Sequence, residues 1–483
     1  MAKYQYNLAV IGAGSAGLVS SYVAAAAKAK VALIERHKMG GDCLNTGCVP
    51  SKAIIRSASF MRDIRRAKQL GFRRAEAEFD FADIMARVHR VIAAIEPHDS
   101  VERYTELGVE CHQGEASMLS PNEVQVGDKR LTARSIIIAS GARPFVPPIK
   151  GLDKVDYKTS DTIWQIREQP KRMIVVGGGP IGTELAQAFA YLGSEVVQVE
   201  SSERILIRED KDASHLVMAQ MKEAGVQVMT KARAQEIEVG NDGQAYMVLT
   251  DVDSGETTRR PFDLLLLAVG RQPNGDSIPG LAETGVKINK RGAVEVDDCL
   301  RTAVPNIYAC GDVIGSYQFT HTAAHGAVTA VRNALTPFLP FKKKIDWSVV
   351  PWCTFSHPEV ARVGLNEQEA KAQNIPFEAV KYGIDDLDRA IADEEAEGFV
   401  KLITTPKGKL LGVTIVGAHA GDLLHEYILA MKQGATVKDV HSMIHIYPTM
   451  AEASRFAAGE WSKKHLPHRA LSAFGWINRF LRG

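Results

Sequence analysis

The sequence of 483 residues lacks any apolar stretch long enough to cross a membrane. Its uninterrupted apolar runs, such as residues 264–269 and 136–139, fall far below the ~18 apolar residues that a spanning helix needs. Neither sign of charge is in excess, because 58 Lys and Arg residues balance 57 Asp and Glu residues to a formal net charge of +1. We therefore expect no nucleic-acid partner, since nothing in this balance indicates a strongly basic surface.

Cysteine is also scarce, with six residues in the whole chain. That number is too small for a disulfide-stabilised scaffold. The first residues have no basic segment, long apolar segment or cleavage site for export, so we expect a reducing, cytoplasmic location. Four cysteines are scattered singly, namely Cys111, Cys299, Cys310 and Cys353. The other two, Cys43 and Cys48, are separated by only four residues and stand out.

The composition is otherwise ordinary, with 45% hydrophobic and 24% charged residues. Such values are typical of a globular protein and exclude global disorder. At roughly 100 to 200 residues per domain, the length predicts about three domains.

A first nucleotide-binding pattern lies near the beginning of the chain. Residues 7–11 form a short apolar strand candidate, followed by Gly12-x-Gly14-x-x-Gly17 and an alanine-rich helical stretch to about residue 28. A second strand candidate, residues 30–35, ends in Glu35, which is suited to bind an adenosine ribose. A glycine-rich turn alone is weak evidence. The ordered set of strand, glycines, helix, strand and acid predicts a dinucleotide-binding unit.

The same pattern recurs from residue 172 to residue 200. Residues 173–176 form a strand candidate, Gly177, Gly179 and Gly182 follow, and the next strand candidate, residues 195–199, precedes Glu200. Two separate Rossmann-like domains are therefore predicted, with different ligands, since electron transfer needs a donor nucleotide and a second carrier. Two further short strands run into residues 140–144 and 270–274, which we interpret as chain crossings between the domains.

The cysteine pair lies in the segment from Gly40 to Lys52, just after the first nucleotide-binding strands. Its C-x4-C spacing is not that of a zinc site, and no second Cys/His pair accompanies it. A helical stretch follows, so the positive end of the helix dipole is expected to lower the pKa of Cys48. This favours a redox-active disulfide. The alternative is a pair of buried, reduced cysteines that act as small hydrophobic residues.

The segment Gly-Gly-Asp-Cys43-Leu-Asn-Thr-Gly-Cys48-Val-Pro-Ser-Lys52, the two glycine patterns and Asn306-Ile-Tyr-Ala-Cys-Gly-Asp312-Val together resemble the pyridine nucleotide-disulfide oxidoreductases. That family includes dihydrolipoamide dehydrogenase, glutathione reductase and mercuric reductase. The resemblance runs from about residue 4 to residue 461. It implies FAD on the first pattern, a nicotinamide nucleotide on the second, and a homodimer.

The resemblance also implies a fold and its domain limits. The fold class is α/β, with two Rossmann-like dinucleotide-binding domains and an α+β dimerisation domain. The FAD-binding domain would take residues 1–148 and 273–341, the nicotinamide-binding domain residues 149–272, and the dimerisation domain residues 342–465. Residues 466–483 remain as a basic amphipathic tail.

Residue roles follow from the same resemblance. Cys48 is expected to face the flavin as the charge-transfer thiol, and Cys43 to meet the substrate as the interchange thiol. Lys52 is expected near the flavin, paired with Glu184, which also lies against the nicotinamide. The residues expected to bind FAD are Gly12, Gly14, Gly17, Glu35, Gly41, Lys52, Ser140, Gly141 and Asp312. Those expected to bind the nicotinamide nucleotide are Gly177, Gly179, Gly182, Glu200 and Gly270.

The sequence departs from the family near its carboxy-terminal end. Disulfide reductases of this type have His-x-His-Pro-Thr-x-x-Glu there, with the second His as acid-base, whereas this chain has His445-Ile-Tyr447-Pro-Thr-Met-Ala-Glu452. A phenol of pKa near 10 is not a base at pH 7, while an imidazole near 6.5 is suited to that role. Mercuric reductase has a tyrosine at this place. It also has a later vicinal cysteine pair, and here no cysteine follows Cys353. We expect His445 to be structural.

These observations predict an FAD-dependent enzyme that oxidises NADH and passes electrons through Cys43 and Cys48 to an acceptor. A thiophilic metal ion, a quinone or another small molecule is favoured as acceptor, and no resident metal is expected. Dihydrolipoamide dehydrogenase or another disulfide reductase is the alternative enzyme, and a redox sensor or binding flavoprotein is the alternative of another class. Glu200 favours NADH over NADPH because it would repel a 2′-phosphate, although Arg204 and Arg208 lie nearby in sequence.

The end of the chain is basic and amphipathic, with no acidic residue after residue 462. Its basic and apolar residues are Lys463, Lys464, Arg469, Arg479 and Arg482, interleaved with Leu471, Phe474, Ile477 and Phe480 at near-helical spacing. Two interpretations stay open: a short amphipathic helix on a membrane surface, or a tail packed on its own dimer.

Overall fold

The structure, a computed structural model, describes residues 3–483 and all their side chains except those of residues 468–470. Its chain forms two compact units. Unit 1 contains the described part of Met1–Arg65 together with Ala75–Ile205 and Ala224–Asp346, and unit 2 contains Arg66–Arg74, Leu206–Glu223 and Trp347–Gly483. In the described residues no helix is long and apolar enough to cross a membrane.

The first nucleotide-binding pattern builds a seven-stranded sheet in unit 1 with the order β3-β2-β1-β6-β5-β4. The seventh strand, β17, lies off this path and also pairs with β6. Its parallel strands are β1 (Tyr6–Ile11), β2 (Val31–Glu35), β3 (Val109–Gln113), β6 (Lys129–Ile138) and β17 (Ile307–Ala309). The antiparallel strands β4 (Ala116–Ser120) and β5 (Glu123–Val126) extend β6. Parallel strands covered on both faces need continuous apolar runs. The sequence supplies these in β1, β2 and the end of β6.

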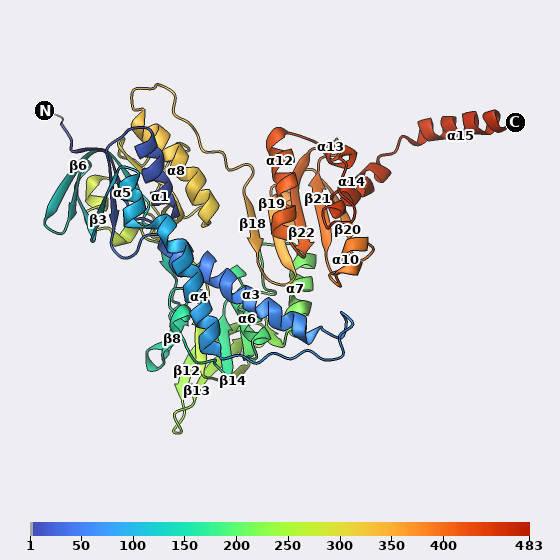
Figure 1. Cartoon of the computed structure of the whole chain (residues 1–483), viewed down its shortest axis with the longest axis horizontal. Coiled ribbons are helices and arrows are strands. Elements are labelled where there is room, and N and C mark those ends of the chain that lie inside the picture. The colour runs from blue at the N-terminus through green and yellow to red at the C-terminus, as the bar shows by residue number, and fades with distance from the viewer. Residues whose placement is uncertain (1–2) are drawn as a thin grey trace. The chain divides into compact units, whose positions relative to one another are not determined.

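Helices cover one face of this sheet. Helices α1 (Ser15–Ala26) and α8 (Thr320–Leu335) lie side by side against it (Figure 1), and Ala323, Ala327 and Val331 of α8 share a core with Leu8 and Val10 of β1. The loop end of β1 and the start of α1 are thereby fixed in place. This is the edge where a dinucleotide binds in such folds.

The second pattern builds a five-stranded parallel sheet, also in unit 1, with the order β11-β10-β9-β15-β8. Its strands are β8 (Tyr157–Thr159), β9 (Arg172–Val176), β10 (Glu195–Val199), β11 (Val226–Met229) and β15 (Leu264–Leu267), with α6 (Pro180–Tyr191) after β9. An antiparallel sheet of β12 (Ala232–Val239), β13 (Ala245–Asp251) and β14 (Thr257–Phe262) accompanies it.

The two predicted chain crossings pair with each other. Strand β7 (Ala142–Pro144) runs antiparallel to β16 (Arg271–Pro273), with Gln272 opposite Arg143. The cysteine segment forms α2 (Gly41–Asn45) and α3 (Cys48–Arg65), and α4 (Phe81–Ile95) and α5 (Val101–Glu106) follow. Helix α3 begins at Cys48, as expected for a thiol at the positive end of the helix dipole.

Unit 2 is built on a five-stranded antiparallel sheet with the order β18-β19-β22-β21-β20. The strands are β18 (Pro351–Thr354), β19 (Glu359–Gly364), β20 (Glu378–Gly383), β21 (Phe399–Thr404) and β22 (Leu410–Gly417). The helices are α7 (Lys211–Glu223), α9 (Glu367–Ala372), α10 (Asp388–Ala392), α11 (Ala420–Leu423), α12 (His425–Gln433), α13 (Val437–Ser442), α14 (Glu452–Lys464) and α15 (His468–Arg482). Helices α12, α13 and α14 supply Tyr427, Val440 and Trp461 to a core shared with Leu402 and Val413 of the sheet.

The structure confirms the expected α/β fold class and the α+β character of the carboxy-terminal part.

The structure also shows a feature of residues 206–223 that the sequence did not indicate. Residues 206–223, inside the segment expected to bind the nicotinamide nucleotide, group with unit 2. There Lys401 of β21, which is 5% exposed, bonds to Asp210 at 3.2 Å and to Asp212 at 2.7 Å. A buried amine needs such carboxylate partners, and these fix the start of α7 on the sheet.

Candidate active site

The turn after β1 leaves no room for side chains. Gly12 has φ +102°, and a Cβ atom there would overlap the carbonyl oxygen of Ala139 at the end of β6. A Cβ atom on Gly17 would overlap the carbonyl oxygen of Gly12, so α1 approaches the strand closely. At Gly14, by contrast, the nearest atom to a Cβ position is 3.8 Å away, on Gly41. The turn therefore offers open backbone beside the amino-terminal end of α1, where a pyrophosphate is favoured.

Glu35 ends β2 beside this turn. Its carboxylate accepts hydrogen bonds from the amide of Ala13 at 2.7 Å and from the amide of His37 at 2.8 Å. Two such bonds leave acceptor capacity on both oxygens, so the carboxylate is fixed in place and still able to bind ribose hydroxyls.

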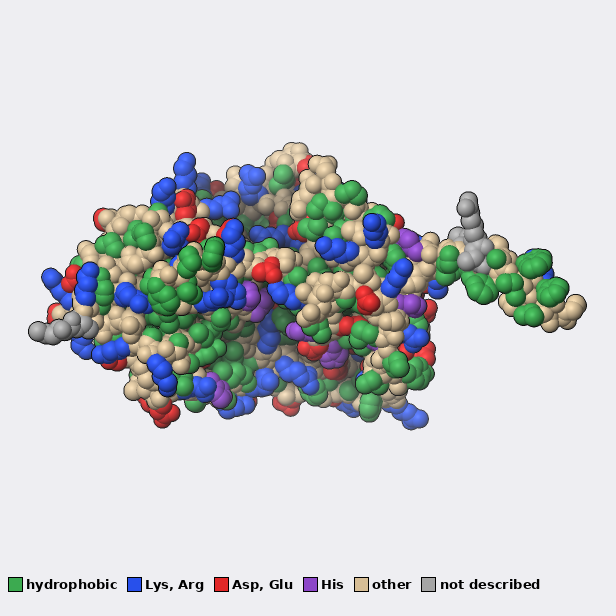
Figure 2. Space-filling view, turned by 90° about the horizontal axis from the view of Figure 1, so that it is seen from above, with side chains coloured by type: hydrophobic (Ala, Val, Ile, Leu, Met, Phe, Trp, Pro, Cys, Tyr) green, Lys and Arg blue, Asp and Glu red, His purple; other side chains and the backbone are tan. Residues whose placement is uncertain are grey.

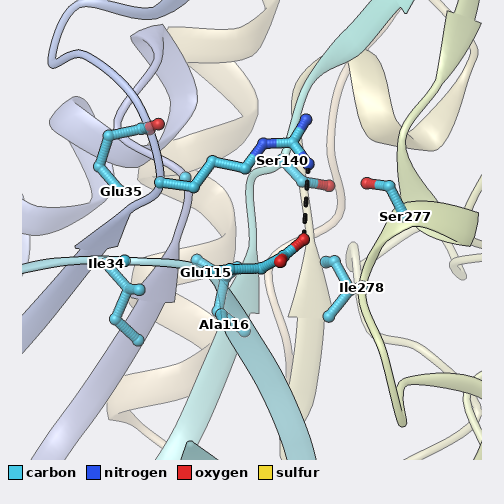
Figure 3. A pocket seen from close by; sticks show the side chains of 11 residues that line it. Ile34, Glu35, Glu115, Ala116, Ser140, Ser277 and Ile278 are labelled. Atoms are coloured by element: carbon cyan, nitrogen blue, oxygen red, sulfur yellow. Dashed lines mark ion pairs between the residues drawn. The ribbon is translucent and has the colours of Figure 1, made fainter. Parts of the chain in front are cut away.

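A pocket opens at this edge of the sheet, lined by Gly12, Glu35 and Ser140 among others (Figure 3). An ion pair between Arg36 and Glu115 at 4.0 Å lies across it. Arg36 and Glu115 were not anticipated from the sequence, because no motif marks them. The pocket thus combines three of the residues expected to bind FAD, Gly12, Glu35 and Ser140.

The second turn repeats this construction. Gly177 has φ +123°, and a Cβ atom on Gly182 would overlap the carbonyl oxygen of Gly177. Glu200 accepts hydrogen bonds from the amides of Gly178 and Ser202, each at 2.7 Å. Around Gly179 and Gly270 a Cβ position meets no atom within 4 Å, which leaves the space that a dinucleotide needs. Arg204 is buried and bonds to Glu203 at 3.1 Å.

The cysteines meet where α2 ends and α3 begins. In the structure both are reduced, with Cys43 half-buried and Cys48 exposed at the first residue of α3. Cys48 Sγ lies 3.5 Å from the Thr320 hydroxyl at the start of α8. The pKa of Cys48 is lowered to about 6, chiefly by the hydrogen bond from Cys43 and also by Thr320 and by the charge of Lys52. The same hydrogen bond and burial raise the pKa of Cys43 above its ordinary value. The pair therefore holds one proton on Cys43 and a thiolate on Cys48.

Lys52 follows one helical turn after Cys48. Its ammonium group bonds to Glu184 of α6 at 2.9 Å, and the Glu184 side chain is only 7% exposed. The structure thus brings the cysteine segment into contact with the helix of the second glycine pattern. Because Lys52 lowers and Glu184 raises the pKa of Cys48, this ion pair tunes the charge of the thiol from both sides.

Asp312 lies in the segment between β17 and α8, in a cluster around Arg271. The guanidinium of Arg271 pairs with Asp42, which precedes Cys43, and lies 3.8 Å from Asp161 and 3.9 Å from Asp312. Burial raises the pKa of Asp312 to about 6, and Arg271 opposes that rise. Gly141 and Ser140 lie beside this cluster, where Ser140 donates a hydrogen bond to the Asn274 carbonyl at 3.3 Å.

The arrangement fits the two expected groups. At Gly14 and Gly179 the backbone is open to a pyrophosphate. The fixed carboxylates of Glu35 and Glu200 offer acceptors for ribose hydroxyls. The charged cluster next to the cysteines offers further donors and acceptors. Within the described residues no group of three or more His, Cys, Asp and Glu side chains is placed to hold a metal ion.

The expected acid-base region lies in unit 2. The Tyr447 hydroxyl donates a hydrogen bond to Asp388 of α10 at 2.9 Å, and this bond raises the pKa of the phenol further. The His445 side chain is 5% exposed, and its Nε2 lies 3.1 Å from a carboxylate oxygen of Glu426. Glu452, also buried, accepts a weak hydrogen bond from the Thr449 amide at 3.4 Å. In this unit Tyr447 therefore has Asp388 as its carboxylate partner.

Taken together, the described residues define a dithiol oxidoreductase with two dinucleotide sites. The family model of the pyridine nucleotide-disulphide oxidoreductases matches residues 6–327, and the model of their dimerisation domain matches residues 350–458. The chain therefore belongs to the pyridine nucleotide-disulphide oxidoreductases. It is an FAD-dependent NAD(P)H oxidoreductase, and its dimerisation domain supports a homodimer.

The similar proteins include mercuric reductases and dihydrolipoyl dehydrogenases. A mercuric reductase of Bacillus cereus is 34% identical over 462 residues, which are 95% of this chain and 72% of that protein. A dihydrolipoyl dehydrogenase of Chlamydia muridarum is 34% identical, over 92% of this chain and 95% of that protein. Among solved structures, the Cu(II) complex of the HOCl-induced flavoprotein disulfide reductase RclA from Escherichia coli superposes with a TM-score of 0.82 at 26% identity, covering 95% and 99% of the two chains.

Besides Arg36 and Glu115, sequence reasoning missed three residues that the structure places in contact with predicted site residues. Thr320 contacts Cys48, Arg271 joins the cluster at Asp312, and Asp388 binds Tyr447. Arg271 stands in the crossing segment Gly270-Arg-Gln-Pro-Asn274, and its position after a buried strand was a usable signal. Thr320 and Asp388 carried none, because only the fold brings them to their partners.

Proposed function

We propose that this enzyme reduces a thiophilic metal ion with NADH, using Cys43 and Cys48 to bind the ion. For a two-electron acceptor the balance is NADH + Hg²⁺ → NAD⁺ + H⁺ + Hg⁰, and for copper it is NADH + 2 Cu²⁺ → NAD⁺ + H⁺ + 2 Cu⁺. When bound, FAD relays the two electrons of the hydride from the nicotinamide to the acceptor side of the site.

The observation that carries the proposal is the hydrogen bond from Tyr447 to Asp388. A phenol that donates to a carboxylate, and whose pKa is raised by it, stays protonated at neutral pH. It cannot take the proton of a thiol. At the family's acid-base position the chain therefore has a hydrogen-bond donor in place of a base.

The state of the cysteines supports the same acceptor. A disulfide substrate must be attacked by the thiolate of the interchange thiol, and the pKa of Cys43 is raised, so little of that thiolate forms without a base. A soft metal ion displaces the thiol proton directly, because metal binding itself deprotonates cysteine. Cys48 supplies the second ligand, already as a thiolate. Binding of the ion thus releases one proton and needs no acid-base residue.

The names of relatives agree with this acceptor class. Mercuric reductases of Bacillus cereus and of Lysinibacillus sphaericus match 95% of the chain at 34% and 35% identity, and the RclA structure is described as a Cu(II) complex. These names belong to those proteins, and they support the metal-ion proposal for this chain.

Three further parts of the proposal concern the donor, the assembly and the roles of the cysteines. NADH is the preferred donor, because the Glu200 carboxylate repels a 2′-phosphate and the buried Arg204 is engaged with Glu203. The active site combines two chains of the homodimer, with Tyr447 of one chain serving the cysteines of the other. Cys48 acts as the charge-transfer thiol and Cys43 as the interchange thiol.

Dihydrolipoamide dehydrogenase activity is the second candidate, and it is favoured by the Chlamydia relative, which matches over nearly its whole length. A quinone acceptor also needs no base at Tyr447. A redox sensor would show cycling of Cys43 and Cys48 without sustained NADH consumption. Steady turnover with any acceptor excludes the sensor.

The test is an acceptor screen on the FAD-loaded dimer. We expect NADH oxidation with Cu(II) or Hg(II) to exceed turnover with dihydrolipoamide and NAD⁺ or with oxidised glutathione, and to be lost in Cys43→Ser. Tyr447→Phe should slow the metal-ion reaction. Tyr382→Phe is the matched control, because Tyr382 also donates to a carboxylate, Asp386 at 2.6 Å, outside the motif. Rapid wild-type turnover with a disulfide and none with metal ions would contradict the proposal.

A further inference from the structure

The last helix of the chain, α15 (His468–Arg482), separates apolar from polar residues. With 3.6 residues per turn, Phe474, Ile477 and Leu481 fall on one side, and Trp476 and Phe480 continue that side. The rest of the circumference has Ser472, Gly475, Asn478, Arg479 and Arg482, with Leu471 among them. The sequence therefore builds an amphipathic helix of 15 residues, about 22 Å long at 1.5 Å per residue.

The apolar side of α15 is exposed. Phe474 is 61%, Trp476 64% and Phe480 74% exposed, and the rings of Trp476 and Phe480 stack on each other with centroids 6.0 Å apart. Apolar side chains run along this helix in the space-filling view (Figure 2). Three exposed aromatic rings on one short helix form an apolar surface that needs an external partner to be buried.

The charge of the carboxy-terminal tail indicates what kind of surface α15 binds. Residues 461–483 contain five Lys and Arg residues and no Asp or Glu, whereas the remainder of the chain is net negative. Two such tails repel each other, which disfavours their pairing with each other in a symmetric dimer. An anionic lipid surface offers phosphates for the basic side and acyl chains for the apolar side of one helix lying in its plane.

The tail is also separate from the family fold. The matched dimerisation domain ends at residue 458, and Pro467 divides α14 from α15. The helix is too short to span a bilayer. We infer that α15 docks this flavoenzyme on the surface of an anionic phospholipid membrane, with Phe474, Trp476 and Phe480 inserted at the level of the headgroups. This inference does not depend on the identity of the electron acceptor.

Vesicle sedimentation of the full-length FAD-loaded enzyme tests the inference. With vesicles of phosphatidylcholine mixed with phosphatidylglycerol, we expect on the order of tenfold more bound enzyme than with phosphatidylcholine alone, and binding should fall in high salt. Equal binding to the two kinds of vesicle, or no binding to either, would overturn it.

Two double variants locate the contact. Phe474→Ser with Phe480→Ser removes the apolar side, and Arg479→Gln with Arg482→Gln removes charge, so each should lower vesicle binding on the order of tenfold. The matched controls are Phe72→Ser, at an exposed phenylalanine elsewhere in unit 2, and Lys407→Gln with Lys409→Gln, at an exposed turn. Both controls should bind like the wild type, and every variant should keep its flavin and its rate of NADH oxidation in solution.

A second measurement separates the membrane from the dimer. Phospholipids with brominated acyl chains should quench a fraction of the tryptophan fluorescence, and Trp476→Phe should abolish that quenching. If the tail instead packs on its own dimer, the two double variants will weaken dimerisation in sedimentation velocity and no quenching will depend on Trp476. That result would refute membrane docking.

Discussion

Replacing Thr320 with valine should raise the pKa of Cys48. The hydroxyl lies 3.5 Å from the sulfur and stabilises its thiolate, whose pKa is lowered to about 6. Hydrogen bonds to charged groups contribute about 1.5–3 kcal/mol, and this long bond to sulfur belongs at the lower end. Its loss therefore corresponds to about one pKa unit, since one unit is about 1.4 kcal/mol.

The sign of the pH dependence follows from the lowered pKa. The thiolate is present above about pH 6 and is lost as the pH falls through that value. At pH 7 we expect ~90% thiolate in the wild type and ~50% in Thr320→Val. The assay is the pH titration of the long-wavelength charge-transfer absorbance of the two-electron-reduced enzyme, which reports the Cys48 thiolate if Cys48 has its proposed role beside the flavin.

Two companion variants make this titration decisive. Thr329→Val changes a buried threonine in the same helix, away from the cysteines, and should leave the midpoint unchanged. Glu184→Gln removes a charge that raises the pKa of Cys48, so its midpoint should move to lower pH. If the Thr320→Val curve superimposes on the wild-type curve, or the wild-type midpoint lies near pH 9, the electrostatic argument for the Cys48 thiolate is wrong.

Four other outcomes are expected. Tyr447→His should raise disulfide turnover by ~10²–10⁴, the usual value of general acid-base catalysis, and a steady-state rate unchanged with oxidised glutathione would count against the missing-base argument. Glu200→Ala should lower kcat/KM for NADH by about 10-fold or more while that for NADPH falls less, because one charge-assisted site for the ribose is lost; equal losses would show that Glu200 does not face the ribose. Gly17→Ala should abolish flavin binding, measured as absorbance per chain, because its Cβ overlaps the Gly12 carbonyl; a fully yellow variant would disprove the close approach. Lys401→Met should lower the thermal midpoint, with a loss of about 3–5 kcal/mol, because it leaves the buried Asp210 without its amine; an unchanged midpoint would show that this ion pair adds no stability.

Much of the fold and of the site was readable from local sequence. The strands around Gly12 and Gly177 were predicted within one or two residues, because close backbone approach demands glycine and a buried parallel strand demands an apolar run. Cys43, Cys48 and Lys52 were found for a similar reason. They lie within ten residues of one another on one segment, so their spacing in the sequence already favours a redox-active cysteine pair.

The sequence by itself also shows a tyrosine, Tyr447, where the resembling disulfide reductases have a histidine, and residue identity sets the ordinary pKa of a side chain. Only the tertiary structure decided which partners tune these groups. Thr320 reaches Cys48 across 272 positions and Glu184 reaches Lys52 across 132. Asp388, 59 positions before Tyr447, holds the phenol. Electrostatic and hydrogen-bond energies depend on distances of a few ångströms between atoms, and those distances exist only after strands and helices from remote parts of the chain have packed together.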